Sequence, residues 1–493
     1  MSKSTFFSYP KQDLVAGTVV FLIALPLCLG IAIACGLPPL SGLIAGIVGG
    51  LIVPIFSRSP LSVTGPAAGL TSIVLMEVQR LGGVSPFLAA VVAAGVLQII
   101  FGLLRTGRFS ALVPAAVIKG MLASIGITII LKQIPVAAGS QGGLADLLEN
   151  WHAGSLLLTV SSLIILYGWK HTPLARFKFF PPALGVVTLC SVGAAFLKGS
   201  PFELSPEQFA AVPVGGLANL VQALPRPDWN ILTTSAGWIA ALTIAIVASI
   251  ETLLSLQAVD RLDPLNRRSP PDRELVAQGT ANALSGFLGG LPVTAVIVRS
   301  GANVAAGGRE RLSAVFHSVL LAMSVIFFAE LLNHIPLACL AAILIQVGLN
   351  LAKPTLFSEQ YKQGFNQFLP FAITILAVLA TDLLKGVMIG LAAGIVFVLR
   401  QNIVGAIETK KSPDGHITIR FTRDITFLSK PLLMTVLERI EEGTHLTIDG
   451  TGEYIDQDVK EALATFLEDA HARNIQVTLK GVVLSGVKAG GGH

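Results

Sequence analysis

The sequence contains little charge. Asp, Glu, Lys and Arg make up 13% of its 493 residues, whereas soluble domains contain roughly 25%. Cysteine is also scarce, and Cys28, Cys35, Cys190 and Cys339 lie in apolar runs without a CxxC pair. This pattern argues against a disulfide scaffold and a metal site and favours buried free thiols. The sequence also shows no nucleophile with an adjacent base and no catalytic carboxylate pair. A cytosolic enzyme, a secreted scaffold and a disordered chain are therefore excluded.

Apolar residues are abundant instead. They form 53% of the chain, and the mean hydropathy is +0.74, which indicates an integral membrane protein. Residues 1–404 carry 24 cationic and 16 anionic side chains, a net charge of +8, whereas residues 405–493 carry 10 and 13, a net charge of −3. Cytoplasmic loops of membrane proteins are rich in Lys and Arg, so the basic excess does not indicate a nucleic-acid partner. The first apolar run has no A-x-A cleavage signature and is expected to remain as a helix.

Twelve uncharged or nearly uncharged runs have the length of a membrane span, because about 20 helical residues cross a hydrocarbon core of ~30 Å. They cover residues 14–37, 38–57, 81–104, 109–131, 154–169, 179–197, 231–250, 275–290, 312–329, 336–352, 368–381 and 386–399.

Two further apolar segments, 61–72 and 291–300, are short and interrupted by Gly or Pro, and both begin Leu-x-Val-Thr. Each is the third segment of its series. Interrupted segments at matching positions of two halves point to a midplane binding site in an inverted-repeat transporter. The sequence therefore predicts a polytopic helical transport domain over residues 1–404. Its fourteen segments form a seven-plus-seven inverted repeat, with repeat 1 at about 10–200 and repeat 2 at about 230–404.

The distribution of cationic residues predicts the orientation of these segments. With the N-terminus inside, seventeen Lys and Arg residues fall in inner loops and five fall in outer loops. This bias places both ends of the membrane region in the cytoplasm. An odd number of segments in each half gives the two halves opposite orientations, as inverted repeats require.

The C-terminal part has the composition of a small soluble domain from about Pro413. Strands are expected over 416–423, 445–449 and 475–480, and helices over 430–442 and 456–473. Alternating strands and helices predict a small α/β layer within a cytoplasmic domain at 405–493. The tail, residues 489–493, is expected to be disordered.

Two ionisable residues deep in apolar segments are candidate functional residues. Arg299 would attract an anion, helped by the positive N-terminal end of the half-helix after Ala295; a structural salt bridge or an interfacial position is the alternative. Glu251 would line a pathway and bind a proton, because an apolar environment favours a neutral carboxyl; a fixed ion pair with Arg299 is its alternative. Lys119 fits a snorkelling structural role, and Glu77 and Arg80 are expected on an exposed face.

The residues resemble the sulfate permease (SulP) family, whose animal relatives include prestin and pendrin. The resemblance rests on Val-Thr-Gly-Pro in the third segment, Ser-Ile-Glu-Thr-Leu-Leu in the eighth and Arg-Ser-Gly-Ala-Asn-Val-Ala-Ala-Gly-Gly in the tenth. It covers nearly the whole chain, and the C-terminal part resembles a STAS domain.

The resemblance implies a core domain that moves against a gate domain in a homodimer, with no cofactor beyond a coupling ion. A small anion would bind between the third and tenth segments, at Ala67, Ala68, Gly69, Thr294, Ala295 and Val296, with Arg299 supplying the field. Many members have Gln and an aromatic residue where this chain has Leu27 and Ile31, so backbone amides would provide most of the binding.

The resemblance leaves the coupling ion and the substrate open. Glu251, with Ser255 one turn later, resembles the branch thought to couple to protons, whereas a sodium-coupled bicarbonate branch has Asp at that position. Residues 119–135 resemble a bacterial subgroup found beside carbonic anhydrase, which hints at bicarbonate. Sulfate, bicarbonate and dicarboxylates therefore remain candidate substrates. An anion channel or exchanger of the same fold is the alternative to a symporter.

Overall fold

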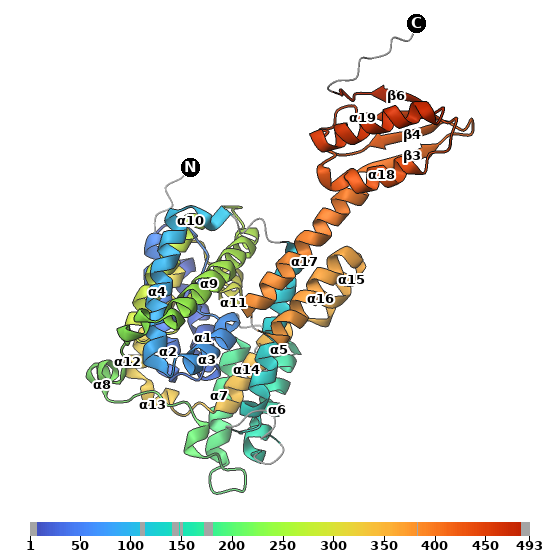
Figure 1. The fold of residues 1–493 in the computed structure, drawn as a ribbon. Helices are drawn as coiled ribbons and strands as arrows, with labels where there is room; N and C mark the ends of the chain where they lie inside the picture. The colour runs from blue at the N-terminus through green and yellow to red at the C-terminus, as the bar shows by residue number, and fades with distance from the viewer. Residues whose placement is uncertain are drawn as a thin grey trace. The chain divides into compact units, whose positions relative to one another are not determined.

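The structure is a computed structural model that describes residues 7–108, 114–140, 147, 151–171, 181–381 and 383–484 (Figure 1). The predicted tail at 489–493 and the cationic residues Lys3, Arg176 and Lys178 lie outside the described residues.

Each of the twelve predicted runs of ordinary length overlaps a helix. These helices are α1 (Pro10–Ala34), α2 (Pro39–Phe56), α4 (Val84–Leu103), α5 (Ala115–Ala137), α6 (Ala153–Gly168), α7 (Pro182–Phe196), α9 (Ser235–Leu262), α10 (Pro271–Phe287), α12 (Leu312–Phe327), α14 (Leu337–Leu351), α16 (Phe365–Ala380) and α17 (Leu383–Val404). Among the described residues, seven helices are long and apolar enough to cross a membrane, and four shorter helices are also apolar. Short helices connect several of them: α8 (Gly216–Ala223), α13 (Ala329–Leu332) and α15 (Pro354–Lys362).

The two interrupted segments each contain a short strand followed by a helical stretch. The first contains β1 (Thr64–Pro66), the 3-10 turn η1 (Ala68–Leu70) and α3 (Thr71–Arg80), and the second contains β2 (Val293–Ala295) and α11 (Ile297–Ala305). The strands pair antiparallel, with Gly65 opposite Thr294. The matching interruptions in the sequence thus meet in space.

The membrane helices pack in two groups. The first bundle contains α1, α2, α4, α9, α10 and α12, and the second bundle contains α5, α6, α7 and α14. Glycine pairs allow the closest approaches: Gly95 of α4 faces Gly279 of α10, and Gly126 of α5 faces Gly348 of α14. A Cβ atom at any of the four would lie 2.5–2.7 Å from the opposing carbonyl oxygen. Small residues at such contacts permit the dense packing that holds helices together where no water is present.

One expectation about α3 is wrong. The sequence suggested an exposed face for both Glu77 and Arg80, and Arg80 is exposed. Glu77, by contrast, is 3% exposed and forms an ion pair with Arg80 (2.9 Å). The reason is that α3 packs against α1, α4 and α5, so the face that carries Glu77 is covered.

Charged residues in the loops hold one end of the first bundle together. Arg267 donates to Asp263 (2.7 Å) and to Glu310 (2.9 Å), and the backbone amides of Arg309 and Glu310 donate to Asp13. This cluster joins α1, the α9–α10 loop and the α11–α12 loop.

The C-terminal part forms a mixed sheet in the order β3-β4-β5-β6, with strands β3 (Ile407–Lys411), β4 (Ile417–Phe421), β5 (His445–Asp449) and β6 (Gln476–Lys480). The predicted strands and helices are present, including α18 (Lys430–Glu438) and α19 (Gln457–Ala472). Strand β3 was missed, because Ile407 is the only strongly apolar residue of Ile-Glu-Thr-Lys-Lys. It pairs antiparallel with β4 at the sheet edge, where lysines commonly discourage further strand pairing.

Candidate functional site

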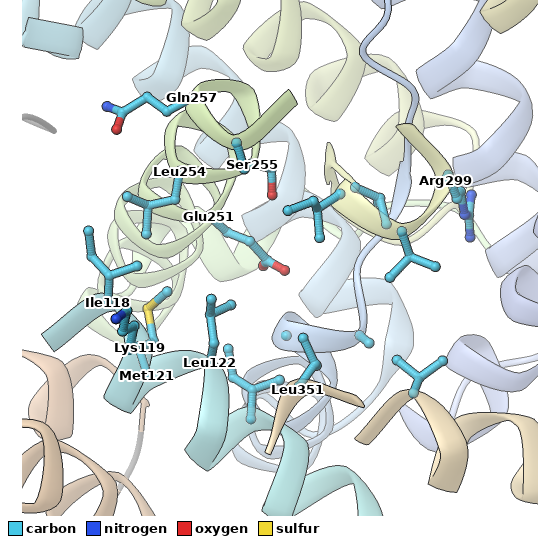
Figure 2. A pocket seen from close by; sticks show the side chains of 18 of the residues that line it. Ile118, Lys119, Met121, Leu122, Glu251, Leu254, Ser255, Gln257, Arg299 and Leu351 are labelled. Atoms are coloured by element: carbon cyan, nitrogen blue, oxygen red, sulfur yellow. The ribbon is translucent and has the colours of Figure 1, made fainter. Parts of the chain in front are cut away.

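A cavity of about 260 Å³ lies between the two bundles, next to the paired interrupted segments (Figure 2). Six of the predicted site residues line it: Ala68, Gly69, Val296, Arg299, Glu251 and Ser255. Ala67, Thr294 and Ala295 are buried and do not line it.

The β1–β2 pair is held from behind by polar side chains of neighbouring helices. Asn282 of α10 accepts from the amide of Val293 (2.6 Å) and donates to its carbonyl (3.0 Å), as a third strand would. Gln278, one turn earlier, donates to Thr64 Oγ1 (2.9 Å). Neither residue was predicted from the sequence. Their spacing of four, continued by Ser285, marks one polar face within the uncharged run 275–290 and is the signal that could have identified them.

Several backbone amides at the predicted site already have partners. The amide of Ala295 donates to Thr252 Oγ1 (3.3 Å), and the amide of Val296 donates to the Val63 carbonyl (2.9 Å). In the first turn of α11, by contrast, Ile297 and Val298 line the cavity, and a helix has no internal acceptors for its first amides. The donors available to an anion are thus one or two residues further along the chain than the sequence suggested.

Glu251 projects from α9 toward η1. The amide of Gly69 donates to its carboxylate, and a Cβ atom at position 69 would lie 2.6 Å from Oε1, so a side chain there would displace the carboxylate. Its other oxygen, Oε2, has no hydrogen-bond partner among the described residues. Within the described residues, Glu251 and Arg299 form no ion pair with each other. The alternative of a fixed pair therefore finds no support.

Arg299 is fully buried, and its three side-chain nitrogens have no hydrogen-bond partner in the described part of the chain. Figure 2 shows the guanidinium on the far side of β2 from Glu251. It occupies the space beside Gly65, where a Cβ atom would clash with Nη1, and it lies near Cys28 and His317. A cation without a counter-ion behind the paired strands makes the cavity wall electropositive, since its field is weakly screened in a dry interior.

The rest of the cavity combines apolar walls with two further cations. Leu27, Ile31 and Leu122 contribute apolar surface, while Lys119 comes from α5 and Arg261 from the end of α9. Lys119 thus lines the cavity, whereas the sequence favoured a merely structural role. Within the described residues, no group of three His, Cys, Asp or Glu side chains could hold a metal ion.

Comparisons with known proteins identify relatives over most of the chain. YvdB of Bacillus subtilis is 28% identical over 411 residues, which cover 79% of this chain and 74% of that protein. The bicarbonate transporter BicA of Picosynechococcus is 25% identical over 431 residues, which cover 84% of this chain and 74% of that protein.

The fold is shared with the murine anion transporter Solute Carrier 26 family member A9 in its inward-facing state. The TM-score is 0.76 at 18% identity, covering 97% of this chain and 86% of that one. The sequence profile of the sulfate permease family matches residues 11–374. This chain therefore belongs to the sulfate permease family and is a multi-pass anion transporter, not an enzyme.

Proposed function

We propose that this protein is a secondary active transporter that couples uptake of one small anion to protons across the cell membrane. The observation that carries the proposal is the cavity itself. An unpaired, fully buried Arg299 lies behind one wall, and the unpartnered Glu251 oxygen belongs to the same site. Unpaired ionisable groups at membrane depth are costly and are typical of substrate and ion pathways.

The anion would bind at the converging half-helices. The first amides of α11, at Ile297 and Val298, and the backbone at Ala68 provide donors, while Arg299 supplies a positive field through the strand pair. The apolar side chains of Leu27 and Ile31 offer no hydrogen bonds. Such a site compensates for the loss of the hydration shell mainly through backbone amides and helix ends.

Glu251 would carry the coupled proton. Protonation removes the negative charge beside η1, so the anion and the proton favour each other's binding. Ser255 lies one turn further along α9 and lines the same cavity. Sodium remains the alternative coupling ion, and it would need several oxygens around Glu251 and Ser255.

The transport step would be an elevator movement in which the first bundle carries the anion past the second bundle. The fourteen segments would form two inverted repeats of seven. The chain would lie in the plasma membrane as a homodimer, with both termini and a STAS-like domain at 405–493 in the cytoplasm.

Uptake into proteoliposomes tests this proposal. Labelled bicarbonate, sulfate and a dicarboxylate are supplied separately, with a proton gradient, a sodium gradient or neither. We expect one of these anions to accumulate when only the proton gradient is present. Accumulation driven by sodium at constant pH would favour the alternative ion, and flux without accumulation under every gradient would indicate a channel or exchanger.

A further inference from the structure

A second cavity, of about 280 Å³, lies at the other end of the contact between the two bundles. On α5, the first cavity is lined by Lys119 near the start of the helix, and the second by Lys132 near its end. On α14 the order is reversed, with Leu351 lining the first cavity and Leu337 the second. The same pair of helices therefore borders both cavities, one at each end of the path.

The second cavity has the chemistry of an anion site. Lys132 forms no ion pair with a described carboxylate, and the thiol of Cys35 at the end of α1 lies close enough to interact with it electrostatically. Ser155 and Gln208 also line the cavity and carry groups that can donate hydrogen bonds. The cavity further includes the first residues of α14, where the helix dipole is positive, and Pro135 and Val136 at the end of α5, where it is negative. One acidic residue, Glu207, is part of the lining and opposes this field.

We propose that the second cavity is an entry site that binds the transported anion before it reaches the central site, with Lys132 as its charged anchor. The inference rests on the proposed transport function. It adds a binding site at the opposite end of α5 from Lys119. The ligand is a small oxyanion such as bicarbonate or sulfate.

The two lysines of α5 act independently. They are thirteen residues apart, which at 1.5 Å per residue is about 20 Å along the helix. Because the Coulomb energy falls with distance, the charge of Lys132 acts mainly on the second cavity and that of Lys119 mainly on the first.

Transport measured separately from each face of oriented proteoliposomes tests the proposal, with labelled bicarbonate and labelled sulfate as probes. We expect K132Q to raise the apparent KM about fivefold or more at one face, with kcat and the KM at the opposite face unchanged. E207Q should lower the KM at the Lys132 face, because it removes an opposing charge, and K132R should restore the wild-type value.

Lys198 provides the matched control, because it is an exposed lysine directly after α7, so K198Q should leave both KM values unchanged. A K132Q variant that loses kcat, or that raises KM equally at both faces, would show that Lys132 is structural and would overturn the entry site.

A labelling experiment separates this inference from the transport function. In a K132C variant that also carries C35A, an anionic thiosulfonate should modify Cys at position 132 faster than a neutral one. Millimolar bicarbonate or sulfate should slow that reaction. Failure of both anions to protect would contradict the entry site even in a protein that transports, and protection in a protein without transport would contradict only the proposed function.

Discussion

At the scale of single residues, the site depends on charges that the protein leaves without partners. Arg299 and Glu251 lie on opposite sides of the short strand β2 (Figure 2). Because neither is neutralised by the other, both charges remain available to the anion and the proton of the proposed mechanism.

Replacing Arg299 tests its role as the source of the positive field. R299A should weaken anion binding by about 2 kcal/mol, because it removes a positive charge whose field is weakly screened in the interior, which is roughly a 30-fold rise in Kd. R299Q, which preserves more of the side-chain volume, should show a similar loss. Isothermal titration with the transported anion measures both. R226A, at an exposed arginine, is the control. Wild-type affinity in both Arg299 variants would show that Arg299 has only a structural role.

Replacing Glu251 tests the coupling. E251Q mimics the protonated carboxyl, so it should abolish accumulation driven by a proton gradient while retaining anion binding and anion exchange. Uptake of labelled anion with and without the gradient measures both activities. E330Q changes an exposed glutamate and should behave like wild type. Continued accumulation by E251Q under a proton gradient alone would contradict the assignment.

At the scale of elements, the short strand pair depends on α10. Asn282 satisfies both backbone groups of Val293 and also donates to Gln98 of α4 (2.6 Å). The β1–β2 pair, which precedes the two half-helices, is therefore held in place by a polar hydrogen-bond network inside the first bundle.

Replacing Asn282 should destabilise the β1–β2 pair. N282A leaves the buried amide and carbonyl of Val293 without partners, each at a cost of about 1–3 kcal/mol. We expect a lower Tm and weaker anion binding, measured by thermal unfolding in detergent with and without the anion. N230A, at an exposed asparagine, should leave both unchanged, and an unaltered Tm for N282A would show that the strand pair needs no such support.

The loop cluster around Arg267 predicts a pH dependence. Burial opposes the charged form of Asp263, but hydrogen bonds from Arg267 and from the Leu265 amide outweigh it and hold the pKa of Asp263 below its usual 3.8. A lowered carboxyl pKa stabilises the fold above that value, and the contribution is lost as the pH falls through the folded-state pKa.

Replacing Asp263 should therefore lower stability in a pH-dependent way. D263N should lower Tm at pH 7, and the difference from wild type should shrink as the pH falls below about 4. Thermal unfolding from pH 3 to pH 7 measures this. A difference that stays constant over the range would show that the charge of Asp263 contributes nothing.

At the scale of the whole molecule, the C-terminal sheet sets where the chain can be divided. The composition changes near Pro413, but β3 lies before that point and pairs with β4. A chain that ends at residue 412 would keep one strand of a hairpin and lose the other.

Truncation tests the division. A chain that ends at residue 404 should retain anion binding and elute as a single species in gel filtration. A chain that ends at residue 412 should aggregate more, because an exposed strand edge pairs with other chains. Complete loss of binding by a well-folded 404-residue chain would show that the C-terminal domain takes part in the site.

The sequence by itself determined the class of molecule and the position of the two interrupted segments. Long apolar runs can only be helices where no water satisfies the backbone, and Gly and Pro at matching places in segments 61–72 and 291–300 located the interruptions. Arg299 and Glu251 stood out because charge is rare in such runs.

Only the tertiary structure decided how those residues act. In the folded chain the Arg299 guanidinium lies behind β2, and the amides of Ala295 and Val296 already donate hydrogen bonds within the protein. Asn282 contacts Val293 only there. These outcomes depend on hydrogen bonds and close contacts between residues far apart in the chain. A sequence pattern shows the period and polarity of one segment. It does not show which hydrogen-bond donor of another segment will contact that segment.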